Sequence, residues 1–381
     1  MNKLFTLLML WMLSCLPSLA QAPMDGGVWK DNTGKHINAH GGNIFNYKGT
    51  YYWYGESRSA DGKPYSSLGV SCFTSKDLKK WTNHGLVLPV TDEPGSDIEG
   101  GCIIERPKVL YNQKTKKFVM WFHLELKGRG YGAARYGVAT SDTPFGPFKF
   151  IRSGRVNPGI YPVGFSKPDT TDLKHQLLFP ELKAWWTPEW RKQIERGMFW
   201  MRDFEGGQMS RDMTIFIDDD GKAYHIYSSE DNLTLQIAQL TDDYMQHNGS
   251  YVRVAAGGQN EAPTIFKQDG TYWMITSGCT GWAPNAARMF KAKNIYGPWE
   301  QLANPCRGEG ANKTFGGQGT FIYKVETAAQ KKMFQGADYV FMADIWNPKQ
   351  LSDSRHLWVP ISWENGAPVL KKQLGCPVLC S

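Results

Sequence analysis

Residues 259–278 read Gln-Asn-Glu-Ala-Pro-Thr-Ile-Phe-Lys-Gln-Asp-Gly-Thr-Tyr-Trp-Met-Ile-Thr-Ser-Gly, with one acidic residue, Glu261, ahead of two short apolar runs. Both runs are rich in β-branched and aromatic residues, and the turn Gln268-Asp269-Gly270 separates them. An Asp-Gly pair between such runs favours a tight turn, so this stretch predicts a β-hairpin with a polar residue at its entrance.

Four further stretches repeat this order of leading residue, strand, turn and strand. The five leading residues are His40, Glu105, Asp212, Glu261 and Gln318. Each repeat continues with a third apolar segment, and several close on a similar phrase, such as that at 141–148. The one long gap, between Glu105 and Asp212, contains an insertion at about 155–205; without it the period is near that of a propeller blade. The sequence therefore predicts an all-β protein, a five-bladed β-propeller with a partly helical insertion between blades 2 and 3. A β-sandwich is the alternative, but it does not explain the shared closing phrase.

The insertion has its own pattern. Residues 182–196 predict a short amphipathic helix that Thr187-Pro188 opens, since Thr is a frequent N-cap and Pro is favoured in the first turn. We expect this helix to shape a substrate pocket, and covering a blade edge is the alternative.

The N-terminus reads as a secretory signal over residues 1–20. A positive start at Asn2-Lys3 precedes an apolar run at 4–16 and a small-residue cleavage site at 18–20. The run is shorter than the roughly 20 residues of a membrane span. We therefore expect residues 21–381 to form a single exported catalytic domain, periplasmic or extracellular. Lipoprotein anchoring through Cys15 is the less favoured alternative.

Composition limits the partners. The net charge of +7 is modest for 381 residues and its basic residues are scattered, whereas nucleic-acid binding needs a cluster. We expect no nucleic-acid partner and no membrane span. Six cysteines follow the signal: Cys72, Cys102, Cys279, Cys306, Cys376 and Cys380. Disulfides, including a clip at the last two, and buried free thiols both stay open, and the absence of a Cys-x-x-Cys pair makes a zinc site unexpected.

In a propeller the innermost strand of each blade starts near the central axis. The five leading residues can therefore converge, and three of them are carboxylates. Converging carboxylates suit hydrolysis of a glycosidic bond: one acid with a raised pKa protonates the leaving oxygen, and a second group activates water. Aromatic side chains near such a site stack on sugar faces, for which Trp53, Trp282 and Trp346 are the candidates.

On these motifs the whole mature chain resembles glycoside hydrolase family 43, and within it the exo-β-1,3-galactanases (galactan 1,3-β-galactosidases). The phrases that carry the resemblance lie at 37–42, 105–109, 210–213, 260–263, 276–282, 315–318 and 346–348. Most of the family has an Asp in the first blade as general base. Here that repeat offers His40-Gly41-Gly42, a departure that is also typical of the galactanase subgroup.

The resemblance implies a role for each converging residue. Glu261 is the general acid, and Gln318 is the base, as an imidic-acid tautomer, or the group that orients the water. Glu105 holds and polarises Gln318, while Asp212 binds substrate and tunes Glu261. His40 binds a sugar hydroxyl, contacts an ion or water in the axial channel, or is a structural histidine. Arg211 and Asn285 are weaker candidates for hydroxyl contacts.

The resemblance implies an exported, inverting exo-glycosidase that releases galactose from β-1,3-galactan, such as the arabinogalactan backbone. An α-L-arabinofuranosidase or β-xylosidase of the same fold is one alternative, and a non-catalytic carbohydrate-binding propeller is another. The reaction needs no cofactor. A structural Ca²⁺ stays open, although no acidic loop has a recognisable ligand spacing and Asp218-Asp219-Asp220-Gly221 is most simply a turn.

Overall fold

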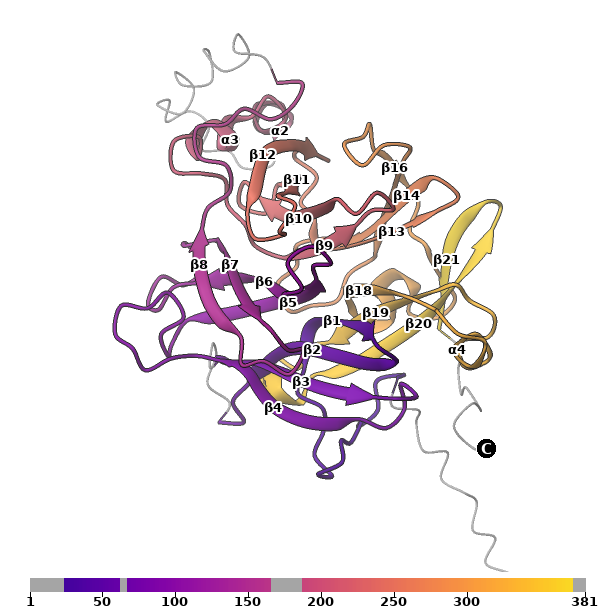
Figure 1. Cartoon of the computed structure of the whole chain (residues 1–381). Coiled ribbons are helices and arrows are strands. Elements are labelled where there is room, and N and C mark those ends of the chain that lie inside the picture. Colours follow the sequence, from indigo (N-terminus) through magenta and orange to yellow (C-terminus); the bar gives the residue numbers. More distant parts are fainter. Residues whose placement is uncertain (1–23, 62–66, 166–186, 373–381) are drawn as a thin grey trace, which may run out of the picture.

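The computed structural model describes residues 24–61, 67–165 and 187–372. Within them, five sheets, antiparallel except for one short strand in the fifth, are arranged around a common centre as the blades of a propeller (Figure 1). The predicted all-β, five-bladed architecture is confirmed. The predicted signal segment, the first part of the predicted helix, Cys376 and Cys380 lie outside the described residues.

Each of the first four blades is a four-stranded sheet whose strands follow one another in sequence. Blade 1 is β1 (His40–Tyr47), β2 (Thr50–Arg58), β3 (Ser67–Ser75) and β4 (Thr82–Pro89). Blade 2 is β5 (Ile103–Tyr111), β6 (Phe118–Glu125), β7 (Arg135–Ser141) and β8 (Lys149–Gly154). Blade 3 is β9 (Met213–Ile217), β10 (Ala223–Ser229), β11 (Thr234–Leu240) and β12 (His247–Val254). Blade 4 is β13 (Glu261–Gln268), β14 (Thr271–Ser277), β15 (Arg288–Ala292) and β16 (Glu300–Leu302).

The fifth blade joins both ends of the described chain. Its strands are β18 (Gln318–Lys324), β19 (Tyr339–Ile345), β20 (Arg355–Glu364), β21 (Ala367–Lys371) and the short parallel strand β17 (Cys306–Arg307). The segment that precedes blade 1 also pairs with β20: Trp358 N donates to Met24 O at 2.7 Å, and Gly26 N donates to His356 O at 3.0 Å. Pairing of early and late segments in one sheet closes the ring.

The innermost strands β1, β5, β9, β13 and β18 contact one another in turn around the centre. Four of them break register near their start, as β-bulges do: directly after the leading residue in β1, β5 and β13, and one residue later in β18. At three of these bulges the next residue has positive φ: 64° at Gly41, 53° at Arg106 and 50° at Ala262. A bulge redirects side chains at the end of a strand, and here it turns polar groups toward the axis.

The helical part of the insertion packs against blades 2 and 3. Helix α2 (Pro188–Glu195) starts at Thr187, whose side chain accepts from Trp190 N at 3.1 Å, as predicted. Helix α3 (Met198–Arg202) follows, and the buried side chains of both helices join Trp121 and Tyr227 in one apolar cluster. The remaining short helices are α4 (Ala328–Met333), η2 (Ala311–Gly316) and η3 (Leu351–Asp353). In the part of the chain that the structure describes, no helix has the length and apolar character to cross a membrane. Cys72, Cys102, Cys279 and Cys306 are free thiols.

A pair of histidines joins blades 2 and 3. His225 Nδ1 lies 3.0 Å from His247 Nε2, and both rings pack on Trp121 with centroid distances of 5.2 and 5.0 Å. Burial lowers the pKa of His225 well below its usual value and that of His247 to about 3. Both imidazoles are therefore neutral in the folded protein, whereas in the unfolded chain they titrate near 6.5.

This pair predicts acid destabilisation. As pH falls from about 6.5 to 5, the unfolded chain takes up protons that the buried rings cannot, so the free energy of unfolding drops by up to about 1.4 kcal/mol per pH unit for each histidine. Urea unfolding at several pH values measures this slope, and His247→Gln reduces it. An unchanged slope in the variant would contradict the assignment.

Candidate active site

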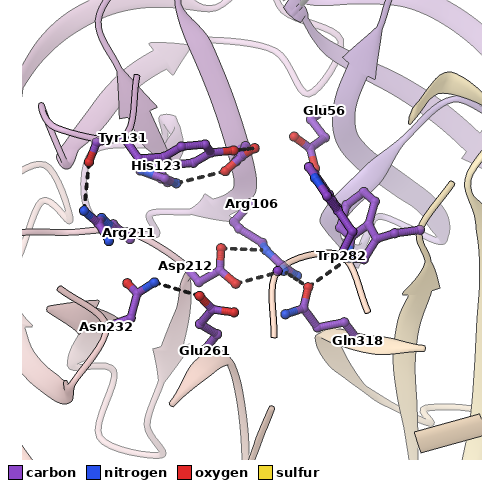
Figure 2. A pocket seen from close by; sticks show the side chains of 13 residues that line it. Glu56, Arg106, His123, Tyr131, Arg211, Asp212, Asn232, Glu261, Trp282 and Gln318 are labelled. Carbon is purple, nitrogen blue, oxygen red and sulfur yellow. Dashed lines mark hydrogen bonds and ion pairs between the residues drawn. The ribbon is translucent and has the colours of Figure 1, made fainter. Parts of the chain in front are cut away.

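A cavity of about 350 Å³ lies at the end of the propeller where the leading residues meet (Figure 2). Four of the five predicted leading residues line it: Glu105, Asp212, Glu261 and Gln318. The other lining residues are Glu56, Arg106, His123, Tyr131, Arg211, Asn232, Gly281, Trp282 and Trp346. Side chains from all five blades therefore meet in one pocket that holds both acidic and aromatic groups.

Glu261 begins β13, and this partly buried residue lines the pocket. Asn232 Nδ2 donates to Glu261 Oε1 at 2.7 Å (Figure 2). Burial raises the pKa of Glu261 to about 7, and the negative charge of Asp212 adds to this, against the nearby Arg106 cation and the hydrogen bonds it accepts. A carboxyl with this pKa is protonated in half of the molecules at neutral pH, as a general acid requires.

Arg106 donates hydrogen bonds to residues of several blades around the pocket. Its Nε and Nη2 donate to the two oxygens of Asp212 at 3.2 and 2.9 Å, and Nη2 also donates to Gln318 Oε1 at 2.6 Å (Figure 2). Its Nη1 donates to Gly319 O at 2.8 Å. Arg106 is almost fully buried, so it ties blade 2 to blades 3 and 5 through bonds that water does not weaken.

Gln318 is held with its amide in a fixed orientation. Besides Arg106, Trp346 Nε1 donates to Oε1 at 2.8 Å, and Gln318 Nε2 donates to Ser277 Oγ at 3.0 Å. We expected Glu105 to hold and polarise Gln318, but the structure gives that place to Arg106 and Trp346. Among the described residues, Glu105 has no hydrogen bond with Gln318.

Glu105 instead belongs to a second ionic group in the pocket wall. It accepts from Arg58 Nη2 and from the Tyr131 hydroxyl, both at 2.9 Å, and its other oxygen lies 3.2 Å from His123 Nδ1. His123 is fully buried, yet hydrogen bonds to Glu105 and Glu125 raise its pKa to about 9. Because the imidazole is cationic and Arg58 is close, the pKa of Glu105 is lowered despite burial, and its carboxylate stays charged.

Two of the three predicted aromatic platforms line the pocket. Trp282 and Trp346 lie edge to face with ring centroids 5.5 Å apart, and Trp282 is 39% exposed at the mouth. Arg211 also lines the pocket and donates to Tyr131 O at 2.9 Å. Asn285 does not line this cavity: its amide bonds to both backbone groups of Gly278 and so holds the loop that carries Trp282.

Two other predicted site residues lie in the interior. Trp53 is 2% exposed and packs edge to face on Trp29 and Trp81, because it pairs with Ile44 in the middle of the blade and not at the strand end that reaches the axis. His40 starts β1 but has no exposed surface. Its ring stacks on His356 at 4.9 Å, with Nδ1 3.7 Å from Asp344. Of its three predicted roles, the structural one fits this burial.

The described helices of the insertion contribute no lining residue to the catalytic cavity. Our expectation of pocket shaping is thus wrong for α2 and α3, whose buried apolar side chains pack against blades 2 and 3 instead.

Sequence reasoning missed several lining residues, chiefly Arg106, Asn232 and Glu56. Glu56 had a signal: it lies directly across the hairpin from His40 in register. Its Oε1 comes within 3.1 Å of the position that a Cβ on Gly41 would take, so the missing first-blade side chain leaves room for it. Burial raises the pKa of Glu56 to about 7, with a contribution from the charge of Glu105 and against that of Arg58.

A calcium ion does not fit the group of donors that His40, Asp344 and His356 form. His40, Asp344 and His356 offer ligand atoms within 4.8 Å of one another. However, Ca²⁺ takes six to eight oxygen ligands, and this group has two imidazoles. The Asp344 oxygens already accept from Gly41 N at 2.6 Å and meet His356 Nδ1 at 2.9 Å.

Comparisons with known proteins agree with this geometry. The family model for glycosyl hydrolases family 43 matches residues 188–326. A solved GH43 β-1,3-galactosidase with galactodeoxynojirimycin is 55% identical with a TM-score of 0.85, over 92% of this chain and 98% of that one. An exo-β-1,3-galactanase from Clostridium thermocellum is 34% identical (TM-score 0.71; 91% of this chain, 64% of that one). One from Phanerochaete chrysosporium, solved as a variant with β-1,3-galactotriose, is 29% identical (0.69; 91% and 66%). A comparison with curated proteins found no match.

The two tryptophans Trp53 and Trp282 predict opposite phenotypes. Trp53→Ala removes a buried core side chain, and we expect a loss of about 3–5 kcal/mol in the free energy of unfolding. Trp282→Ala removes an exposed ring at the pocket mouth, so stability changes by less than about 0.5 kcal/mol while KM rises. Chemical unfolding and saturation kinetics measure the two effects. An intact stability in Trp53→Ala would show that its ring is not in the core.

Proposed function

Because the chain belongs to glycosyl hydrolase family 43 and is a glycoside hydrolase, we propose that it removes galactose from the end of β-1,3-galactan with inversion of configuration. One observation carries the proposal: a partly buried glutamic acid, Glu261, shares the pocket with an amide held by three hydrogen bonds, Gln318, while the first blade has His40-Gly41 in place of the usual base. The galactodeoxynojirimycin and the β-1,3-galactotriose in the related structures support galactose as the sugar.

In this proposal Glu261 donates its proton to the glycosidic oxygen as the bond to the anomeric carbon breaks. Burial, and after it the negative charge of the Asp212 carboxylate, keeps the pKa of Glu261 high, at about 7. The ion pair with Arg106 and the bond from Ala262 N at 3.1 Å keep Asp212 in place. Since Glu261 must be protonated, kcat/KM falls as pH rises through this value.

Gln318 orients the attacking water in this mechanism. Both lone-pair directions of its Oε1 are occupied, by Arg106 and Trp346, so an imidic acid with a hydrogen on that oxygen would crowd three hydrogens around one atom. We therefore favour water orientation over the tautomer. The water's proton then passes to a pocket carboxylate, for which Glu56 is suited by its pKa of about 7.

The proposal includes cellular location and requirements. Export is supported by the charged, apolar and small-residue segments at 1–20, and one catalytic unit over 21–381 by the closed ring of blades. Hydrolysis needs only water and the residues named, so no cofactor is required.

A substrate panel tests the proposal. The protein is incubated with β-1,3-galactobiose, an aryl arabinofuranoside and an aryl xyloside, and ¹H NMR follows the first-formed anomer. We expect galactose, appearing first as the α-anomer because the β-bond is inverted. Arabinose or xylose alone would replace the galactanase by the rival enzymes of this fold. Turnover of none of the three would indicate a carbohydrate-binding propeller.

Paired variants separate the two sides of the sugar. Glu261→Gln lowers kcat/KM on galactobiose by about 10²–10⁴-fold but spares aryl galactosides with good leaving groups, which need no acid. Gln318→Ala slows both substrates and opens space for azide, which then yields α-galactosyl azide. Detection of that product by NMR, absent in Glu261→Gln, is the expected result. Equal losses on both substrates in Glu261→Gln would remove Glu261 from the acid role.

A further inference from the structure

Three consecutive residues between β10 and β11 have a backbone conformation that L residues rarely adopt. Glu230, Asp231 and Asn232 have φ of 53°, 56° and 66°, and none is glycine. Leu233 N donates to Glu230 O at 3.1 Å and closes the turn. Strain of this kind persists only where the surroundings hold it, and it gathers at functional sites. We call residues 230–232 the left-handed turn.

Glu230 anchors this turn in the interior. It is fully buried and meets the Arg253 guanidinium along two bonds, Nε to Oε1 at 2.6 Å and Nη2 to Oε2 at 2.8 Å. Arg253 also donates to the last carbonyls of α2, to Ile194 O at 2.6 Å and Glu195 O at 2.9 Å. One side chain thus joins the left-handed turn to the helix of the insertion.

Asp231 makes a second link to the insertion. Its Oδ2 accepts from Arg202 Nη1, in α3, at 2.5 Å, and its Oδ1 lies 3.7 Å from Arg211 Nη2, a pocket residue. Both helices of the insertion therefore hold the turn, although neither reaches the cavity.

The third residue of the turn points at the catalytic pocket. Asn232 Nδ2 donates to Glu261 Oε1 at 2.7 Å (Figure 2). Its Oδ1 is buried and has no hydrogen-bond partner among the described residues, so it is available to a substrate hydroxyl. Hydrogen bonds and ion pairs thus connect α2 and α3, through the left-handed turn, to the Glu261 carboxyl.

We propose that the left-handed turn is a positioning device for the acid: Asn232 fixes the Glu261 carboxyl, and the helical insertion holds Asn232 in place through Arg253 and Arg202. The inference rests on the proposed role of Glu261. In this inference the helical insertion contributes to catalysis without lining the pocket, because residues outside the pocket set the orientation of the Glu261 carboxyl.

The isosteric variant Asn232→Asp tests the contact. Asp tolerates positive φ as Asn does, but it replaces the donor by a second carboxylate, which raises the pKa of Glu261. We expect the basic limb of kcat/KM to move up by about one pH unit. Asn365→Asp is the matched control, since Asn365 has φ of 50° in the hairpin between β20 and β21, and we expect no shift there.

A measurement without substrate separates this inference from the proposed function. ¹³C NMR of carboxyl-labelled protein, with Glu261→Gln to assign the signal, gives the titration of Glu261 directly. An upward shift in Asn232→Asp supports the contact even if galactobiose is not turned over. An unchanged titration overturns it even if the wild type is a galactanase.

The variant Arg253→Lys tests whether Arg253 holds the left-handed turn. It keeps the positive charge but loses the paired hydrogen bonds to Glu230 and those to the α2 carbonyls. We expect kcat/KM on galactobiose to fall about ten- to hundredfold, with aryl galactosides of good leaving group spared. Combined with Asn232→Gly, the loss is smaller than the product of the single losses, because both variants release the same carboxyl. Losses in kcat/KM that multiply in the double variant, or an equal loss on galactobiose and on aryl galactosides, would contradict this role of Arg253. Arg307→Lys, on an exposed side chain, is the control.

Discussion

The buried guanidinium of Arg106 is the contact on which the catalytic centre depends. It arises from blade 2, yet its donors end on Asp212 before blade 3 and on Gln318 and Gly319 of blade 5. A buried cation is stable only when its hydrogen bonds are satisfied, and here the partners are groups that the reaction needs in fixed positions. The positive φ of Arg106, at the bulge of β5, is the backbone strain that aims it across the axis.

Charge balance around this cation explains why two glutamates behave differently in one cavity. Glu105 lies against Arg58 and the cationic His123, so it stays ionised, with a lowered pKa. For Glu261, burial raises the pKa to about 7 and the negative Asp212 adds to this, which outweighs the Arg106 cation and the hydrogen bonds that the carboxyl accepts. A pocket that separates the pKa values of its carboxyls assigns their roles, since the acid must carry a proton and the supporting anion must not.

The sequence predicts those features that follow from blade periodicity. Each leading residue stands at the start of an innermost strand, so the approach of Glu105, Asp212, Glu261 and Gln318 follows from the repeat itself. It does not predict which neighbour each side chain bonds, because Arg106 reaches Gln318 across 212 positions of sequence. Trp53 shows that residue type alone can mislead. A tryptophan suits a sugar-stacking platform, but Trp53 lies in the middle of a strand and its side chain is therefore in the core.

Propeller architecture also limits how a catalytic acid can be held. The inner strands supply residues at the axis, and in four of them a bulge redirects the backbone at this end. A bulge fixes the backbone and not the end of a long side chain. The Glu261 carboxyl also accepts a hydrogen bond from outside its own blade, since Asn232 donates to it from the loop of blade 3. This loop has three consecutive non-glycine residues with positive φ, a strained conformation that must itself be stabilised. The buried ion pair Glu230–Arg253 stabilises it. The insertion interrupts the repeat just before blade 3, where its helices can reach this pair, so its position in the chain follows from the support that the acid requires.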